Sequence, residues 1–278
     1  MKQKMRYFKI SWYSKEDGPG TRVVLFLQRC NLRCKWCHSP HSHSDRPPIL
    51  YYADFCTACG KCVEICSQHC HNTEGQRHIF SREKCTLCLK CVSVCSRKAL
   101  AYDYYEETSA ELYRRLKPEL TLLGEGGGIT VSGGEPLLQW QEVRELLEMC
   151  KADGFHTAVE TSASFQGQVL SELDGVVDCW LFGLKQTNPV LCRDMTGADI
   201  SVVLNNLETI ALKSPDKIII RTPLIPGYTD DEENLCRIRE IMEHYHIRKQ
   251  ELLPFNPNTR HYYTTGGIPY LLEQDREI

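Results

Sequence analysis

The sequence predicts an α/β fold, a partial TIM-like barrel of about six strand–helix units, interrupted by a small cysteine-rich insert. Two observations carry this prediction. Short apolar runs alternate with longer amphipathic segments, which is the pattern of a parallel sheet. Eleven of the 16 cysteines follow two motifs between residues 30 and 95. Six units are too few for a closed eight-stranded barrel, so we expect a sheet that is open on one side and admits a large substrate.

The strands are expected where β-branched or continuous apolar runs occur, as in strands that are covered on both faces. These runs are residues 21–27, 129–131, 155–159, 176–182, 217–222 and 250–253. Helices are expected between them at 107–122, 137–152, 166–173, 199–213 and 231–246. The segment 137–152 has apolar spacing near 3.6 residues, and Asp230 and Asp231 are candidate N-caps of 231–246. We expect residues 1–47 and 100–278 to form the barrel and 48–99 to form the insert.

Composition excludes several classes of function. The formal charge is −3, from 33 basic and 36 acidic residues, so nucleic acid is not an expected partner. No apolar run reaches membrane-spanning length, and the N-terminus lacks the core of a signal peptide. We therefore expect a cytoplasmic, monomeric protein that does not bind a membrane. Thiols stay reduced in the cytoplasm, so 16 cysteines there argue for metal or cluster ligation rather than disulfides.

Eight cysteines form two copies of C-x2-C-x2-C-x3-C, the second beginning 29 residues after the first. This spacing is typical of two-cluster bacterial ferredoxins, in which the fourth cysteine of each run ligates the other cluster. We expect one [4Fe-4S] cluster on Cys56, Cys59, Cys62 and Cys95, and another on Cys85, Cys88, Cys91 and Cys66. The usual proline after each fourth cysteine is replaced by Ser67 and Ser96. A pair of zinc sites is the alternative, and Cys70 is expected to be an unliganded thiol.

The first cysteine motif, CNLRCKWC, has three cysteines and no fourth at ligand distance: Cys30, Cys34 and Cys37. Three thiolates on a cubane cluster leave one iron open, and an open metal position is where chemistry occurs. The alternative is a zinc knuckle that His38 or His41 completes.

This motif, C-x3-C-x2-C with an aromatic before the third cysteine, resembles that of the radical S-adenosylmethionine (SAM) superfamily. DGPGTRVVLFLQRCNLRCKWCHSP (17–40) is similar to the N-terminal signature of the activating enzymes of glycyl radical enzymes. ITVSGGEPLL (129–138), RTPLIPGYTDDEEN (221–234) and LLPFNPN (252–258) resemble further motifs of that family. The insert with two ferredoxin-type motifs is similar to that of its larger members.

The resemblance implies a function. In the family, SAM chelates the open iron, and an electron from the cluster splits SAM into methionine and a 5′-deoxyadenosyl radical. That radical removes hydrogen from one glycine of a partner, a glycyl radical enzyme, under anaerobic conditions. A flavodoxin or ferredoxin would supply electrons, and the insert would relay them or dock the partner. The competing functions are a radical SAM enzyme that acts on a small molecule or peptide, an electron-transfer ferredoxin on a barrel scaffold, and a zinc-stabilised binding module.

The resemblance also implies roles for residues that follow the predicted strands, where chemistry sits in βα architectures. Gly133 and Gly134 would let the backbone approach SAM, and Glu135 would face its amino group. The other residues expected to contact SAM are Trp36, His38, Glu160, Thr161, Gly183, Lys185, Arg221 and Asn256. The simpler explanation of Glu160 and Arg221 is a rim charge, and that of Lys185 is a solvated lysine.

One position departs from the family pattern. LFGLKQTN (181–188) has Gly183 where relatives have an aspartate that, together with an acidic residue at the position of Glu160, is associated with a monovalent cation near SAM. One carboxylate is therefore missing, and we expect a weaker or altered cation site.

Overall fold

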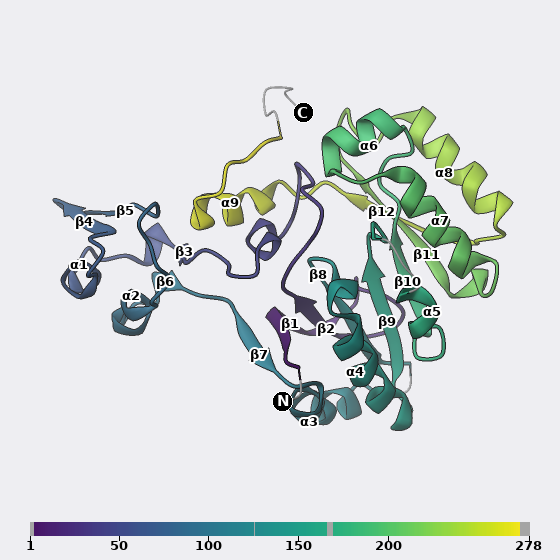
Figure 1. The fold of residues 1–278 in the computed structure, drawn as a ribbon, viewed down its shortest axis with the longest axis horizontal. Helices are drawn as coiled ribbons and strands as arrows, with labels where there is room; N and C mark the ends of the chain where they lie inside the picture. The colour runs from purple at the N-terminus through teal and green to yellow at the C-terminus, as the bar shows by residue number, and fades with distance from the viewer. Residues whose placement is uncertain (1–2, 125, 166–168, 273–278) are drawn as a thin grey trace.

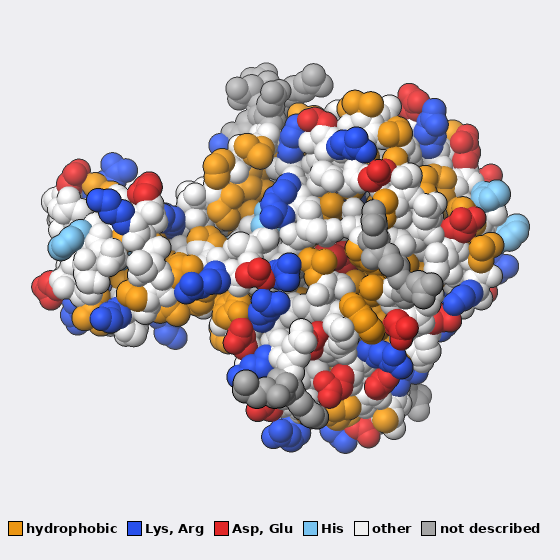
Figure 2. Space-filling model, in the orientation of Figure 1, with side chains coloured by type: hydrophobic (Ala, Val, Ile, Leu, Met, Phe, Trp, Pro, Cys, Tyr) orange, Lys and Arg blue, Asp and Glu red, His pale blue; other side chains and the backbone are white. Residues whose placement is uncertain are grey.

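The computed structural model describes residues 3–124, 126–165 and 169–272. A large α/β body carries a smaller lobe to one side (Figures 1 and 2). The body is built on an eight-stranded mixed sheet with the order β12-β11-β10-β9-β8-β2-β1-β7. Among the described strands β12 and β7 are its edges, so the sheet is open. None of the helices in the described part of the chain is long and apolar enough to cross a membrane.

All six predicted strands are confirmed as the parallel part of the sheet. They are β2 (Arg22–Leu27), β8 (Gly128–Gly133), β9 (His156–Thr161), β10 (Cys179–Gly183), β11 (Ile218–Leu224) and β12 (Lys249–Pro254). β1 (Met5–Ser14) pairs antiparallel with β2 and with the edge strand β7 (Tyr105–Glu107), and neither β1 nor β7 was predicted. β10 starts three residues later than expected.

The predicted helices are present with shifted ends. They are α3 (Ser109–Leu122), α4 (Trp140–Ala152), α5 (Val169–Leu173), α7 (Ile200–Ala211) and α8 (Glu232–His244). α4 is preceded by a 3-10 turn, η3 (Pro136–Gln139). Residues 166–168 of the expected helix 166–173 lie outside the described residues. Asp231 caps α8 by accepting from the Asn234 amide, whereas Asp230 accepts from Gly227 in the preceding turn. Two helices were missed, α6 (Pro189–Thr196) and α9 (Arg260–Gly266).

Strand alternation separates the core into two faces. The helices cover one face of the sheet (Figure 1), and the main core includes Trp180, Phe182 and Ile220 on that side. The opposite, inner face carries a small cluster of Ala158, Cys179, Leu181 and Ile219. Because side chains alternate along a strand, the next inner positions toward the carboxyl ends are polar or small. These positions are Glu160 on β9, Gly183 on β10 and Arg221 on β11.

The smaller lobe is the cysteine-rich segment. Its two cysteine runs share a short helix and the same positions of left-handed backbone. It contains α1 (Lys61–Ile65), a hairpin of β4 (His71–Glu74) and β5 (Arg77–Phe80), and α2 (Lys90–Val94). A short pair, β3 (Leu50–Tyr51) with β6 (Leu100–Ala101), closes it against the body. Residues with positive φ recur 29 residues apart, which is the offset between the two motifs. The pairs are Ala58 and Leu87, Gly60 and Leu89, and His69 and Lys98.

Candidate radical SAM site

A cavity of about 790 Å³ lies at the carboxyl ends of the parallel strands, on the inner face of the sheet. Cys30, Cys34 and Cys37 line it together. So do nine of the residues that the resemblance assigned to SAM: Trp36, His38, Gly133, Gly134, Glu160, Thr161, Gly183, Lys185 and Arg221. These residues are spread over almost 200 positions of the sequence, and the structure brings them together around one cavity.

The cysteine loop is held by backbone contacts with two neighbours. The amides of Arg33 and Lys35 donate to the carbonyls of Thr196 and Met195, at 2.9 and 3.0 Å, so the C-terminal end of α6 supports the loop. On the other side the amides of Gly134 and Glu135 donate to Leu27 and Arg29. The loop that carries the three thiols is thus fixed between α6 and the turn after β8.

The close contact between the cysteine loop and the turn after β8 explains why positions 133 and 134 are glycines. A Cβ at Gly133 would lie 2.1 Å from the Leu27 nitrogen, and one at Gly134 would lie 2.0 Å from the Arg29 carbonyl oxygen. Gly133 also has φ of +120°, a region that glycine tolerates best. The two glycines therefore allow the cysteine loop to pass close to the β8 turn, a reason that the sequence did not reveal.

The thiols have the surroundings of cluster ligands. The amide of Leu32 donates to the Cys30 sulfur and that of Ser39 donates to the Cys37 sulfur, both at 3.4 Å. Burial raises the pKa of Cys30 to about 12, and it also raises the pKa of Cys34 and Cys37. The three thiols are partly buried and would stay protonated alone, and a bound cation that favours thiolates would reverse this. The donor set therefore fits an iron–sulfur cluster.

Arg221 crosses the cavity wall between two carboxylates. Its Nη1 donates to Glu160 Oε1 at 2.7 Å and its Nε to Glu251 Oε2 at 2.8 Å. Burial lowers the pKa of this guanidinium, but the two carboxylates outweigh burial and raise it overall. Glu251 lines the cavity and was missed, although it directly precedes the LLPFNPN motif. Asp17, in the DGPG segment, also lines the cavity, and burial raises the pKa of its carboxyl.

Two expected SAM contacts are not on the cavity wall. Glu135 is fully buried, and its carboxylate accepts bonds from the hydroxyls of Thr161 and Ser162 and from the amides of Ser162 and Leu137. It fastens the β8 turn to the end of β9 and does not face the cavity. Asn256 is exposed, and its side chain accepts from the Asn258 amide in the turn η5 (Pro257–Thr259). A sequence motif specifies the type of a residue but not the direction of its side chain, so the directions of Glu135 and Asn256 could not be predicted from their motifs.

Trp36 and His38 leave the cysteine loop in different directions. Trp36 is nearly buried and packs with Met195, Ile225 and Leu272 in a cluster beside the cavity. His38 lines the cavity, where desolvation lowers the pKa of its imidazole. His41 is buried against Phe8 and Tyr262. The structure therefore does not direct His41 to the three thiols, as a zinc knuckle would require.

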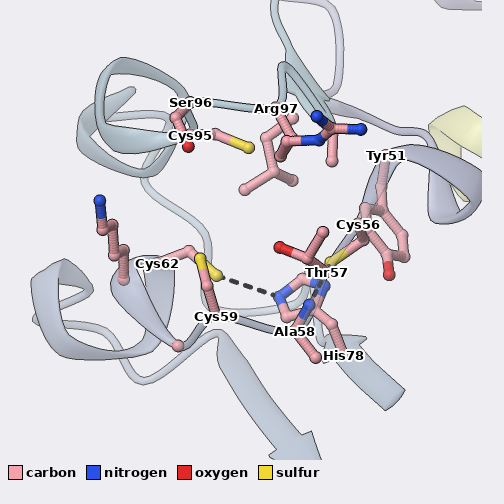
Figure 3. Close-up of a pocket in the computed structure, with 14 residues that line it drawn as sticks. Tyr51, Cys56, Thr57, Ala58, Cys59, Cys62, His78, Cys95, Ser96 and Arg97 are labelled. Carbon is pink, nitrogen blue, oxygen red and sulfur yellow. Dashed lines mark hydrogen bonds between the residues drawn. The ribbon is translucent and has the colours of Figure 1, made fainter. Parts of the chain in front are cut away.

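The smaller lobe has two cysteine pockets, and each combines both motifs. Cys56, Cys59, Cys62 and Cys95 line the first pocket (Figure 3). Cys66, Cys85, Cys88 and Cys91 line the second, together with Cys70, whose amide donates to the Cys66 sulfur at 3.4 Å. The exchange of the fourth cysteine is the arrangement of two-cluster ferredoxins and differs from two independent zinc sites.

Comparison with known proteins agrees with this geometry. The family model of the radical SAM superfamily matches residues 24–238. The choline trimethylamine-lyase activating enzyme of Oleidesulfovibrio alaskensis is 33% identical, covering 98% of this chain and 90% of that protein. The benzylsuccinate synthase activating enzyme of Thauera aromatica is 36% identical over 84% of this chain and 72% of that protein.

A solved structure is similar in fold. The Streptococcus suis protein SuiB, crystallised with its precursor peptide SuiA, covers 91% of this chain and 41% of its own length with a TM-score of 0.52 and 12% identity. The fold and the site define a radical SAM protein. Within that superfamily, the chain belongs to the activating enzymes of glycyl radical enzymes. It is an enzyme of that class, and membership implies a [4Fe-4S] cluster, SAM and a glycyl radical enzyme as partner.

Proposed function

We propose that Cys30, Cys34 and Cys37 hold the SAM-cleaving [4Fe-4S] cluster and leave one iron open in the 790 Å³ cavity. The convergence of these three thiols with two amide donors on the cavity wall carries the proposal. When bound, the reduced cluster supplies the electron that splits SAM, and the resulting 5′-deoxyadenosyl radical takes hydrogen from a glycine of the partner. Glycine suits this step because its α-radical is stabilised by both adjacent amides and no side chain obstructs it.

The chain itself supplies position and charge. The three Cys residues and His38 occupy one end of the cavity wall, and the Arg221 ion pairs with Glu160 and Glu251 occupy the strand ends. Lys185 is a cation for the SAM carboxylate or ribose, and its ammonium lies 2.9 Å from where a Cβ at Gly183 would be. Holding the reacting atoms in line is the main catalytic contribution of such a site. No acid–base pair is needed for the hydrogen transfer.

The smaller lobe, residues 48–99, is proposed to be a ferredoxin-like domain with two auxiliary [4Fe-4S] clusters. The quartets Cys56, Cys59, Cys62 and Cys95, and Cys66, Cys85, Cys88 and Cys91, would hold them. Amide-to-sulfur contacts of the Ala58 amide with Cys56 and the Cys70 amide with Cys66 support this, because such donors stabilise thiolates. A flavodoxin or ferredoxin would be the reductant, and residues 1–47 and 100–278 would form a partial barrel in a monomer.

The test is anaerobic and uses the partner. The reconstituted full chain is reduced, mixed with SAM and with a glycyl radical enzyme encoded beside its gene, and examined by electron paramagnetic resonance (EPR). We expect a glycine-centred radical that Cys34→Ala abolishes and Cys236→Ala retains, since Cys236 lies exposed on α8. A radical that survives Cys34→Ala would overturn the assignment of the site.

A further inference from the structure

Two histidines of the smaller lobe are buried side by side. His71 on β4 is 4% exposed and His78 on β5 is 5% exposed. Nδ1 of His71 lies 3.0 Å from Nε2 of His78. Buried imidazoles need partners, and the radical SAM site described above uses neither ring.

The pair connects the two cysteine pockets. His78 lines the first pocket, where its Nε2 lies 3.4 Å from the Cys62 sulfur (Figure 3). His71 lines the second pocket, with Cys66 and Cys85. The β4–β5 hairpin thus places one imidazole at each pocket and joins them by a hydrogen bond.

The surroundings indicate which nitrogen of His78 carries the proton. Nε2 faces two acceptors, the Cys62 sulfur and Nδ1 of His71, whereas Nδ1 of His78 is buried without a hydrogen-bond partner among the described residues. An orphaned buried N–H is more costly than an orphaned acceptor. The proton therefore belongs on Nε2, and this one N–H is shared between Nδ1 of His71 at 3.0 Å and the Cys62 sulfur at 3.4 Å.

Both rings are held in place by packing. The His78 ring packs edge-on against the Tyr51 ring, with 4.8 Å between the ring centroids, and the His71 ring stacks on the Phe80 ring, with 4.4 Å between the centroids. The donor is therefore fixed relative to Cys62 before any cluster binds.

We propose that His78 is a positioning residue that donates a hydrogen bond to the Cys62 sulfur and raises the reduction potential of the first auxiliary cluster above that of the second. His71 keeps the ring of His78 in this orientation. The inference rests on the proposed function, which places a cluster on Cys62. A reduced cluster carries more negative charge than an oxidised one, so a donor to its sulfur stabilises the reduced form more.

The experiment uses the full chain with Cys30→Ala, Cys34→Ala and Cys37→Ala, so that only the smaller lobe holds clusters. Iron is measured after anaerobic reconstitution, and the midpoint potentials are measured by EPR-monitored redox titration. The variants are His78→Leu, which removes the donor, His78→Gln, whose amide can still donate, and Gln76→Leu, which removes an exposed polar side chain from the turn between β4 and β5.

We expect two midpoints. His78→Leu should move the higher midpoint to a more negative potential and leave the other unchanged. His78→Gln should restore part of the shift, and Gln76→Leu should shift neither midpoint. Two midpoints that do not move in His78→Leu overturn this inference alone. A smaller lobe without iron, or with zinc on Cys62, His71 and His78, whose ligand atoms lie within 4.8 Å of one another, overturns the auxiliary clusters and the inference together.

Discussion

Arg221 and Glu160 form an almost buried ion pair at the carboxyl ends of the parallel strands, with Nη1 of Arg221 2.7 Å from Oε1 of Glu160. The Arg221 side chain is 7% exposed and that of Glu160 is 28% exposed, so water screens this pair less than a surface pair. Ser132 donates to the second oxygen of Glu160. The pair joins β9 to β11 at the cavity wall, and its charge balance depends on Glu251 as well.

We expect Glu160→Gln to weaken SAM binding about tenfold, which corresponds to roughly 1.4 kcal/mol. The change keeps the size of the side chain but removes one of the two charges that hold Arg221. The free energy of unfolding should fall by about 1.5–3 kcal/mol, the usual range for a hydrogen bond to a charged group. Calorimetric titration with SAM measures the first effect. Glu172→Gln breaks an exposed pair with Arg144 and is the control; equal SAM affinity in all three proteins would contradict the role of Glu160.

Gly133→Ala should destabilise the protein by on the order of 3 kcal/mol, because the added Cβ meets backbone atoms of Leu27. The matched control is Gly154→Ala. Gly154 also has positive φ, +82°, but a Cβ there meets nothing within 4 Å, so the backbone strain alone should cost about 1 kcal/mol. Only Gly133→Ala should also lower the iron bound per chain, since it displaces the cysteine loop. Equal iron content in the two variants would show that the turn after β8 does not position the loop.

Asn188 should matter to the cysteine loop although no role in the site was expected of it. Its side chain caps α6 by accepting from the Val190 and Leu191 amides, and the far end of α6 holds the backbone of Arg33 and Lys35. Asn188→Ala and Thr108→Ala, which uncaps α3, should each cost about 1 kcal/mol of stability. Only Asn188→Ala should speed the loss of iron to a chelator from a chain that lacks the cysteines of the smaller lobe. Equal rates would contradict the link between α6 and the loop.

Potassium should affect SAM cleavage less in this protein than in relatives that have an aspartate at the position of Gly183. A Cβ built at Gly183 lies 2.9 Å from the Lys185 ammonium, which is the flexible end of its side chain. Gly183→Asp should increase the dependence of the cleavage rate on potassium, and Gly183→Asn, of equal size without charge, should not. A potassium dependence in the unchanged protein as steep as in such a relative would show that the cation site is intact.

The parallel sheet was predictable because most of its strands are apolar runs that are buried along their length, β12 at the edge being the exception. Short, continuously apolar runs rich in β-branched residues, such as VVLFL and KIIIR, are typical of buried strands, and all six predicted strands are confirmed. β1 was missed because its outer part is half-exposed and mixes lysine and serine with aromatics. α6 was missed because it is eight residues long, which gives too few turns for a periodic pattern.

The residues on the cavity wall were predictable where a motif sits at the end of a strand, because the sheet then determines the direction of the side chain. Glu160 and Arg221 are examples, on inner-face positions of β9 and β11. Glu135 and Asn256 lie in turns beyond the strand ends, where hydrogen bonds to nearby amides determine the direction instead. Glu251 has no motif of its own, and only the register of β11 with β12 places it opposite Arg221.

The most direct test measures the products of SAM with the reconstituted, dithionite-reduced protein in the absence of any partner. We expect that methionine and 5′-deoxyadenosine are released in equal amounts, and that Cys34→Ala abolishes the release while the iron of the smaller lobe remains. Methionine release that persists at the unchanged rate in Cys34→Ala, or none from the fully iron-loaded unchanged protein, would contradict it.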